Sequence, residues 1–471
     1  MSQKLFIKFG TDGVRGVIDR DFNERLVAVL TEATIRYWSR RYGLRKILVG
    51  YDVRRKSQQY ANIAASVALE HGLDTVLVSR PTPTPVVAWY GSHFGFDLII
   101  QITASHNPPI YNGFKVITKQ GAPTPDDDTG NIEKLYDEEW QDIERSVLNI
   151  VVKDVPTVDP KPEYVDHVVN DALGMFKPRS KLRVLVDPLF GTSIGYTSEV
   201  LSRLGMYVVE VHNYYDPGFG GRNPNPEPEN IYDTIQEVIG GKYDIGIAHD
   251  CDADRIGAVD PKHGYLSPNN IITIIIEHLA KRGVIKRGIT KSTSTTHIVD
   301  LIASRYGLRV YEVPVGFKHA VRYMINGDAD VAGEESSGLA YSWHVPDKDG
   351  IYTAALLTTI ASEYGSLTYV FDEIIKEYGS TFYRRIDLQF SGGKEFVRKN
   401  ERVLMEKLRD LGIIKRVITI DGIKVIFDDN SWILIRGSGT EPVIRIYAEA
   451  GSRDRLERII NNAVSIINSL R

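Results

Sequence analysis

Short apolar runs rich in β-branched residues alternate with amphipathic stretches from the start of the chain to about position 340. The run at 46–51 predicts a buried parallel strand, and residues 58–70 carry apolar positions at the spacing of a helix. This alternation predicts α/β sheets with helices on both faces. Further strands are expected at 75–78, 98–102, 183–186, 243–248, 288–290, 309–313 and 329–332.

The C-terminal part of the chain has a different pattern. Three strand-like runs at 424–427, 433–436 and 443–448 come before a predicted helix at 453–467. Apolar residues line one face of that helix at 3.6-residue spacing, which predicts a smaller α+β domain. These residues are Leu456, Ile459, Ile460, Ala463, Val464 and Ile467.

Linker signals divide the chain. Prolines cluster at 155–162, and a second break in pattern falls at 260–268. The predicted fold class is α/β, with three similar domains of mixed, largely parallel sheets followed by the α+β domain. The expected domains are 1–154, 155–259, 260–375 and 376–471.

Composition narrows the function classes. The 57 Lys and Arg residues nearly balance the 61 Asp and Glu residues, so no basic excess favours a nucleic-acid partner. Any anionic ligand must therefore be held by a local cluster of positively charged side chains. No apolar stretch is long enough to predict a membrane helix. Cys251 is the one cysteine, which excludes an internal disulfide. The chain opens without a signal-peptide core, and we expect it in the cytoplasm.

Ser105 is a candidate nucleophile. It follows the predicted strand at 98–102, and ligands bind at the carboxyl ends of strands in open α/β sheets. A serine hydroxyl needs a base or a metal to become reactive, and His106 or Lys115 could supply a base or a charge. The alternative is a loop serine that only caps the next element.

A second loop, directly after the strand at 243–248, carries Asp250, Asp252 and Asp254 at alternate positions, followed by Arg255. Carboxylates that converge in a tight loop suit Mg²⁺. A calcium loop with the same beginning needs a glycine next and a terminal glutamate, and a strand-like run follows instead. The alternative is a solvated acidic loop, and Asp126-Asp127-Asp128 is expected to be one.

Two more loops carry ligand-binding side chains. The segment at 333–338 places Glu334 and Ser336 after a strand, where they suit a ligand rich in hydroxyls; a plain polar turn is the alternative. His344 and Lys348 follow as possible proton-handling groups. The segment at 436–442 interleaves Arg, Ser and Thr with glycine, which favours a phosphate cradle over a plain hairpin turn. Arg445 could assist this cradle.

Together these loops resemble the α-D-phosphohexomutase superfamily over essentially the whole chain. Gly-Glu-Glu-Ser in the third loop and Lys-Asp-Gly at 348–350 are similar to the phosphoglucomutase branch. A phosphoglucosamine mutase usually carries Gln and a Ser-Gly-His ending in the third loop, whereas position 338 of this chain is glycine. Cys251 and Ala253 stand where glycine is frequent, and we expect the thiol to point away from the metal. The matching segments are 9–16, 103–108, 250–255, 315–318, 333–338 and 436–442.

The resemblance implies four domains around a central cleft, the last able to move. It implies interconversion of hexose 1-phosphate and hexose 6-phosphate through a phosphoserine and a bisphosphate. Glucose is expected ahead of mannose as the sugar of the substrate. Mg²⁺ is the implied cofactor and glucose 1,6-bisphosphate the activator; the partners are small hexose phosphates, and the protein is a monomer or dimer. The alternatives are a phosphoglucosamine mutase, a sugar-phosphate phosphatase and a non-catalytic sensor.

The resemblance also implies roles for residues. The phosphorylated Ser105 coordinates the metal, Arg255 and Arg15 lie beside its phosphoryl group, and Lys115 matches the acid/base position best. Glu334 and Ser336 bind the sugar hydroxyls O3 and O4. His106, His344 and Lys348 remain acid/base candidates. The implied metal ligands are Ser105, Asp250, Asp252 and Asp254, and the other implied substrate-binding residues are Gly316, Lys348, Arg436, Ser438, Gly439, Thr440 and Arg445.

Overall fold

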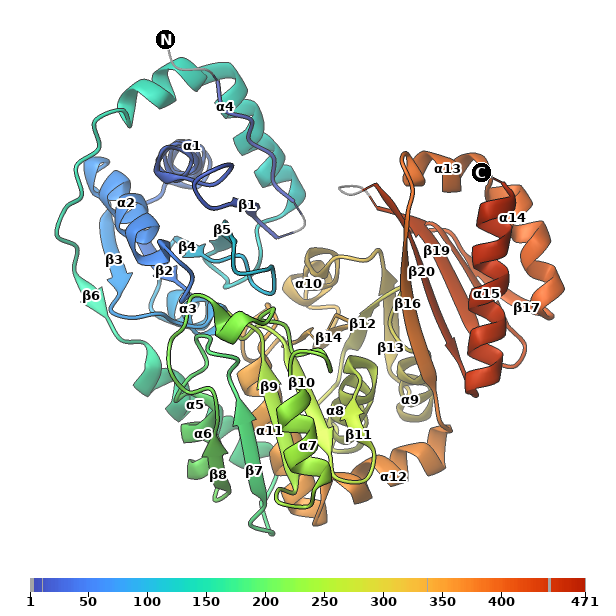
Figure 1. Cartoon of the computed structure of the whole chain (residues 1–471). Coiled ribbons are helices and arrows are strands. Elements are labelled where there is room, and N and C mark those ends of the chain that lie inside the picture. The colour runs from blue at the N-terminus through green and yellow to red at the C-terminus, as the bar shows by residue number, and fades with distance from the viewer. Residues whose placement is uncertain (1–3, 11, 337, 439–441, 471) are drawn as a thin grey trace.

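The computed structural model describes residues 4–10, 12–336, 338–438 and 442–470, and within them the chain forms four successive β-sheets with their helices (Figure 1). The units follow one another in an arc that runs from blue through green and yellow to red in Figure 1. The first and last units lie at its two ends. The predicted fold class is confirmed: three units have mixed, largely parallel sheets, and the fourth has an antiparallel sheet.

The first sheet has the order β1-β5-β4-β2-β3-β6. Its centre is parallel, and β5 folds back antiparallel on β4. Because β6 pairs with β3, this sheet reaches past the division proposed after residue 154. The strands are β1 Val14–Val17, β2 Lys46–Tyr51, β3 Asp74–Val78, β4 Leu98–Ile102, β5 Tyr111–Thr118 and β6 Thr157–Val158, and the helices are α1 Glu24–Tyr42, α2 Ser57–Glu70, α3 Thr84–His93 and α4 Asp126–Ser146.

One expectation in this unit is wrong. The acidic triplet that begins at Asp126 is not a loop but the first turn of α4. Pro125 precedes it, and carboxylates near a helix N-terminus are favoured by the helix dipole.

The second sheet has the order β11-β10-β9-β7-β8 and repeats this plan, with parallel strands followed by the antiparallel hairpin of β9 and β10. Its edge strand β11 lies beyond the division proposed after residue 259. The strands are β7 Arg183–Asp187, β8 Tyr207–Glu210, β9 Ile245–His249, β10 Ile256–Asp260 and β11 Gly264–Leu266, and the helices are α5 Lys161–Met175, α6 Thr197–Arg203, η1 Phe219–Gly221 and α7 Tyr232–Ile239.

The third sheet has the order β13-β12-β14-β15, again ending in an antiparallel hairpin. Helix α11 is buried along almost its whole length because it packs between α5 and α6 of the second unit and α8 of its own. The strands are β12 Gly288–Ser292, β13 Arg309–Val313, β14 Val331–Glu334 and β15 Gly338–Tyr341, and the helices are α8 Pro268–Lys281, α9 Ile298–Tyr306, α10 Phe317–Ile325, α11 Gly350–Tyr364 and α12 Leu367–Tyr378.

The fourth sheet is antiparallel, with the order β16-β20-β19-β18-β17. The predicted C-terminal helix is α15, and all members of its apolar stripe are buried except Val464, which is half-buried. The strands are β16 Phe382–Gln389, β17 Ile414–Ile418, β18 Ile423–Phe427, β19 Trp432–Gly437 and β20 Val443–Ala450, and the helices are α13 Gly393–Lys399, α14 Glu401–Leu408, η2 Arg409–Leu411 and α15 Arg453–Ser469.

Buried apolar residues form separate cores. One cluster runs continuously through the first three units, whereas the fourth unit has a cluster of its own. Polar contacts join the fourth unit to the third, among them Lys424 Nζ to Glu312 Oε1 at 2.6 Å and Val315 N to Asp421 Oδ2 at 3.0 Å. None of the helices in the described residues has the length and apolar character needed to cross a membrane.

Candidate active site

The loops singled out in the sequence share one structural position. Each joins the two strands of an antiparallel hairpin: β4 to β5, β9 to β10, β14 to β15, and β19 to β20. In the first three units the leading strand of the hairpin also pairs in parallel with a neighbour, so its loop lies at the carboxyl edge of the sheet. The repeated plan therefore delivers a chemically different loop from each unit.

Ser105 occupies the β4–β5 loop and is buried. Its backbone has a φ of 51°, in the left-handed region that non-glycine residues seldom adopt. Its Oγ donates to Asp250 Oδ2 at 2.8 Å, so the proposed nucleophile of the first unit touches the acidic loop of the second. Thr103 Oγ1 accepts the backbone N–H of Ser105 at 2.9 Å.

The three aspartates of the β9–β10 loop form one buried cluster. Each offers a carboxylate oxygen within 4.8 Å of the others. Oδ1 of Asp252 and Oδ1 of Asp254 are buried without a hydrogen-bond partner among the described residues. Burial, followed by repulsion from Asp254 and Asp252, raises the pKa of Asp250 well above its usual range. Orphaned hard oxygens and crowded negative charge fit a site for Mg²⁺.

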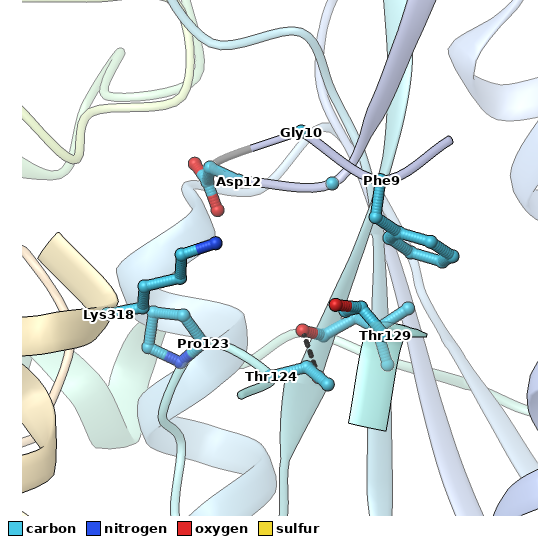
Figure 2. Close-up of a pocket in the computed structure, with 9 residues that line it drawn as sticks. Phe9, Gly10, Asp12, Pro123, Thr124, Thr129 and Lys318 are labelled. Carbon is cyan, nitrogen blue, oxygen red and sulfur yellow. Dashed lines mark hydrogen bonds between the residues drawn. The ribbon is translucent and has the colours of Figure 1, made fainter. Parts of the chain in front are cut away.

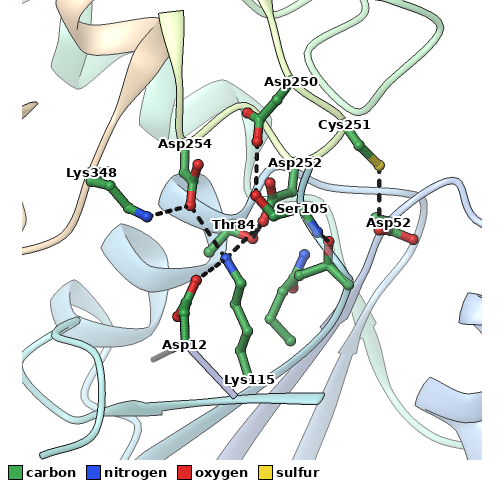
Figure 3. Close-up of polar contacts among 12 residues, drawn as sticks. Asp12, Asp52, Thr84, Ser105, Lys115, Asp250, Cys251, Asp252, Asp254 and Lys348 are labelled. Atoms are coloured by element: carbon green, nitrogen blue, oxygen red, sulfur yellow. Dashed lines mark hydrogen bonds and ion pairs between the residues drawn. The ribbon is translucent and has the colours of Figure 1, made fainter. Parts of the chain in front are cut away.

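Two lysines reach the same aspartates from other units (Figure 3). Lys115 Nζ, on β5, lies 3.0 Å from Asp252 Oδ2 and 3.3 Å from Asp254 Oδ2. Lys348 Nζ, from the third unit, lies 3.0 Å from Asp254 Oδ2. Although burial opposes the charge, the surrounding carboxylates, with that of Asp12 foremost, raise the pKa of Lys115 well above its usual range. Lys115 therefore stands in the site as a cation.

Asp12 and Thr84 are site residues that the sequence interpretation missed. Asp12 Oδ2 lies 2.9 Å from Lys115 Nζ, and the nearby cations lower the pKa of Asp12 to about 2 in spite of its burial. Thr84 Oγ1 donates to Asp252 Oδ2 at 2.6 Å. Asp12 lies in the 9–16 segment that carried the resemblance, so a signal existed for it. Thr84 belongs to the Thr-Pro run at 81–85, in which no residue pattern pointed to a ligand.

His106 lies in the serine loop itself, and Arg15 on β1 contacts that loop. Arg15 Nη1 donates to Asn107 Oδ1 at 2.5 Å. His106 Nδ1 is 3.4 Å from Ser105 Oγ. Burial and then the positive charges of Arg255 and Arg15 lower the pKa of His106 well below its usual range, so the ring is neutral.

Arg255 closes the acidic loop. Its Nε lies 3.8 Å from Asp254 Oδ1 and 4.0 Å from Asp250 Oδ2, and it is buried without a hydrogen-bond partner among the described residues. An arginine held near carboxylates with an unused donor is suited to bind an oxyanion beside them. The loop is tightly packed, because a Cβ at Gly350, where α11 begins, would lie 2.3 Å from the Arg255 carbonyl oxygen.

The third loop brings together three of the predicted substrate-binding residues. Glu334 Oε1 accepts the backbone N–H of Gly316 at 2.8 Å, and Glu334 Oε2 accepts from Ser336 Oγ at 2.8 Å. Gly316 is the N-cap of α10, so the carboxylate also lies at a helix N-terminus. A glutamate side chain with spare lone pairs is an acceptor for sugar hydroxyls.

His344 and Lys348, although close in the chain, have different surroundings. His344 is buried, with Nε2 2.7 Å from Asp349 Oδ2 and Nδ1 2.9 Å from His167 Nε2. Of the two, Lys348 is the one in contact with the aspartate cluster.

The fourth loop presents its arginines from paired strands. Arg436 on β19 is the register partner of Arg445 on β20. Each faces a carboxylate: Arg436 Nε is 2.8 Å from Asp421 Oδ2, and Arg445 Nε is 3.3 Å from Asp387 Oδ2. Ser438 is buried, and its N–H donates to a backbone oxygen across the hairpin. Gly439 and Thr440 lie outside the described residues.

A small pocket beside Asp12 joins two of the segments that carried the resemblance (Figure 2). Its lining includes Phe9, Gly10 and Asp12 from the N-terminal segment and Lys318 from α10. Lys318 also pairs with Asp126 at the start of α4. The first and third units are therefore in direct contact next to the site.

Comparisons with known proteins agree with this geometry. Models of the phosphoglucomutase/phosphomannomutase family match alpha/beta/alpha domain I at 7–142, domain II at 162–264, domain III at 267–378 and the C-terminal domain at 394–465. The chain belongs to the α-D-phosphohexomutase superfamily. As a member of this superfamily it is an enzyme that moves phosphoryl groups on sugars.

Individual relatives match over nearly their full length. A "probable phosphoglucosamine mutase" of Methanosphaera stadtmanae is 30% identical over 467 residues, which cover 98% of each chain. A phosphoglucomutase/phosphomannomutase of Thermococcus kodakarensis is 28% identical over 464 residues, again with 98% of each covered. The crystal structure of a "putative phosphomannomutase" from Thermus thermophilus has a TM-score of 0.83 at 28% identity, covering 99% of this chain and 100% of the other.

Proposed function

We propose that this enzyme interconverts hexose 1-phosphate and hexose 6-phosphate, with glucose as the preferred sugar and mannose as a second, through a phosphorylated Ser105. The observation that carries the proposal is the 2.8 Å contact between the Ser105 hydroxyl and Asp250 inside a buried aspartate cluster. A hydroxyl that touches a carboxylate in a site for a hard cation can carry a phosphoryl group whose oxygens contact that cation. A hydroxyl of a bound substrate can then accept the phosphoryl group.

Asp250, Asp252 and Asp254 would hold Mg²⁺, which when bound withdraws negative charge from the phosphoryl oxygens. Arg255, whose Nε has no hydrogen-bond partner in the part of the chain that the structure describes, would donate to an equatorial oxygen of the phosphoryl group. Lys115 adds a positive charge at the aspartate cluster, and we assign it as the acid/base group: as a cation it can protonate the released Ser105 Oγ and then take up the proton of the attacking hydroxyl. Phosphoryl transfer depends mainly on such positioning and charge.

The reaction is balanced as two transfers. The bond between phosphorus and Ser105 Oγ breaks while phosphorus bonds to O6 or O1 of the bound monophosphate, and the proton of that hydroxyl passes through the acid/base group to the released Ser105 Oγ. The resulting bisphosphate reorients in the site. Ser105 Oγ then bonds to the phosphorus of the other phosphate, the bond from that phosphorus to the sugar oxygen breaks, and the proton of Ser105 passes back to the sugar oxygen. Added glucose 1,6-bisphosphate would enter at this point and act as an activator, because it phosphorylates a free serine.

Reorientation of the bisphosphate requires binding groups that accept the sugar in both orientations. Glu334 accepts and Ser336 both donates and accepts, so this pair can hold O3 and O4 when the two hydroxyls exchange places. Arg436, Arg445 and Ser438, with Gly439 and Thr440, would hold the phosphate that is not reacting. The two arginines are register neighbours, which suits one shared anion.

The preference for glucose rests on the third loop, where a phosphoglucosamine mutase usually ends in Ser-Gly-His and this chain has glycine at position 338. A Cβ at Gly338 would lie 2.3 Å from Cδ of Lys348. The glycine therefore makes room for the lysine that reaches Asp254. A phosphoglucosamine mutase is the second candidate, because the relative from Methanosphaera stadtmanae has that name.

A substrate panel tests the proposal. The purified protein is given glucose, mannose, glucosamine and N-acetylglucosamine 1-phosphates with Mg²⁺ and a trace of glucose 1,6-bisphosphate. We expect the fastest formation of the 6-phosphate from the glucose compound. A faster reaction with glucosamine 1-phosphate would establish the second candidate, and release of inorganic phosphate faster than isomerisation would indicate a phosphatase.

A further inference from the structure

Arg54 lies beneath the Ser105 loop with no exposed side-chain surface. Its Nη2 donates to the carbonyl oxygens of Ser105 and Asn107, both at 2.5 Å. Its Nη1 donates to those of Pro108 at 2.8 Å and Tyr111 at 3.0 Å. One guanidinium thus donates hydrogen bonds to carbonyl oxygens from the beginning to the end of the loop that carries the nucleophile.

The remaining donor of Arg54 faces Asp52. Arg54 Nε is 3.2 Å from Asp52 Oδ2 in a fully buried ion pair. Asp52 Oδ1 in turn accepts from the backbone N–H of Arg54 at 2.9 Å and from Ser57 Oγ at 2.6 Å. A guanidinium has five N–H groups. Those on Nη1 and Nη2 donate to the loop carbonyls, whereas Nε lies near Asp52 as an ion pair and has no hydrogen-bond partner among the described residues.

Cys251 connects this pair to the metal-binding loop. Its Sγ donates to Asp52 Oδ2 at 3.3 Å, and Figure 3 shows the thiol directed away from the neighbouring Asp250 and Asp252. The expectation for the direction of this side chain is thus confirmed. The thiol is buried in a small apolar cluster that includes Phe219, whose ring centroid lies 5.2 Å from the Arg54 guanidinium. In such a dry environment hydrogen bonds and ion pairs are strengthened.

We propose that Arg54, Asp52 and Cys251 form a positioning network that fixes the Ser105 loop relative to the metal-binding loop. The inference rests on the proposed function, in which Ser105 carries the phosphoryl group. Ser105 has an unfavourable left-handed backbone, and such conformations persist where the surroundings hold them. The carbonyls bound by Arg54 include that of Ser105 itself, so the network acts on the strained residue directly.

Arg54→Lys tests the network, with Arg55→Lys as the matched control. Arg55 is the next residue, is 56% exposed and pairs with Asp19 at the surface. A lysine keeps the charge at position 54 but loses the fork that holds carbonyls on both sides. Because small displacements of reacting groups are costly, we expect Arg54→Lys to lower kcat by roughly tenfold to a hundredfold with KM nearly unchanged. Arg55→Lys should leave both constants unchanged.

Amide hydrogen exchange provides a readout that does not depend on catalysis. In Arg54→Lys, exchange should accelerate in peptides covering 103–113 and stay unchanged in the fourth unit. An unchanged kcat, or unchanged exchange in those peptides, would overturn the proposal. If instead the native protein fails to isomerise any sugar phosphate, the proposed function is rejected while the exchange result still decides whether Arg54 holds the loop.

Substitutions at Cys251 test the link between the loops and remain informative if Arg54→Lys does not fold. Cys251→Ala removes the donor to Asp52, and Cys251→Ser restores one. We expect the Mg²⁺ concentration for half-maximal activity to rise several-fold in Cys251→Ala and to return toward the native value in Cys251→Ser, as for other groups that support metal ligands. Equal Mg²⁺ requirements in the native protein and both variants would show that the thiol does not position the metal-binding loop.

Discussion

The hydroxyl of Ser105 lies 2.8 Å from a carboxylate oxygen of Asp250, although the two residues are 145 positions apart in the chain. They belong to hairpin loops of different units, and Lys348 of a third unit reaches the same aspartate cluster. The site therefore depends on how the first three units pack together, which the continuous apolar core through them secures.

Replacing Ser105 removes the proposed carrier of the phosphoryl group. We expect Ser105→Ala to lose mutase activity by several orders of magnitude, because groups that act as a unit in catalysis are not individually dispensable. Mass spectrometry of the native protein incubated with glucose 1,6-bisphosphate should show one phosphate on the peptide containing residue 105. Ser146→Ala, at an exposed position of α4, serves as control. Near-normal turnover by Ser105→Ala would exclude the covalent route.

Asp252→Asn is predicted to weaken the binding of Mg²⁺. The amide has the shape of the carboxylate but lacks its charge, so the Mg²⁺ concentration for half-maximal activity should rise by at least about tenfold. Activity measured against Mg²⁺ after removal of metal with a chelator tests this. Asp142→Asn on the surface of α4 should titrate like the native protein. The metal assignment is wrong if the Asp252→Asn curve does not move.

Arg436→Ala should chiefly affect substrate binding. Loss of a charged hydrogen bond to the phosphate that is not reacting predicts a KM about ten to a hundred times higher, with a smaller change in kcat. Arg384→Ala is a suitable control, because Arg384 lies on β16 of the same sheet and pairs with Glu457 at the surface. If both variants have the native KM, the phosphate cradle lies elsewhere.

The buried Lys424 predicts a pH dependence of stability. Burial, and next the positive charge of Lys291, lower the pKa of Lys424 to about 8 from its ordinary 10.5, despite the partner Glu312. Between pH 8 and 10.5 the Lys424 side chain is mostly protonated in the unfolded chain and mostly neutral in the folded protein. The folded state therefore gains stability as pH rises through this range. Below pH 8 both states carry the charge and the dependence vanishes.

Urea denaturation of the native protein and of Lys424→Met between pH 7 and 10 measures this effect. The free energy of unfolding of the native protein, relative to that of the variant, should increase by about 1.4 kcal/mol per pH unit above pH 8. Lys415→Met, at an exposed lysine of β17, should show no such increase. A relative stability that stays level or falls above pH 8 contradicts the prediction.

Much of the fold could be predicted because buried strands leave a strong local pattern. The runs that became β2 and β9 are apolar on both faces, and the stripe on α15 repeats at helical spacing. The triplet at Asp126 was misassigned because its charge was interpreted as a sign of solvation, whereas a proline before acidic residues also marks the beginning of a helix.

The candidate site was predictable only as separate loops. That Asp12 lies against Lys115, or that Thr84 donates to Asp252, depends on the packing of distant segments, and no spacing within either segment encodes it. The same holds for Arg54, whose carbonyl partners lie more than fifty positions away. Such contacts follow from sheet order and unit packing, which a local pattern does not specify.

The separate apolar core of the fourth unit has a thermal consequence. A lobe that buries an apolar core of its own, and meets its neighbour through polar pairs and one small apolar contact at Val315, can melt by itself, so heating should produce two calorimetric transitions instead of one. A sugar phosphate held at once by arginines of that lobe and by loops of the other units would raise the lower transition and draw the two together.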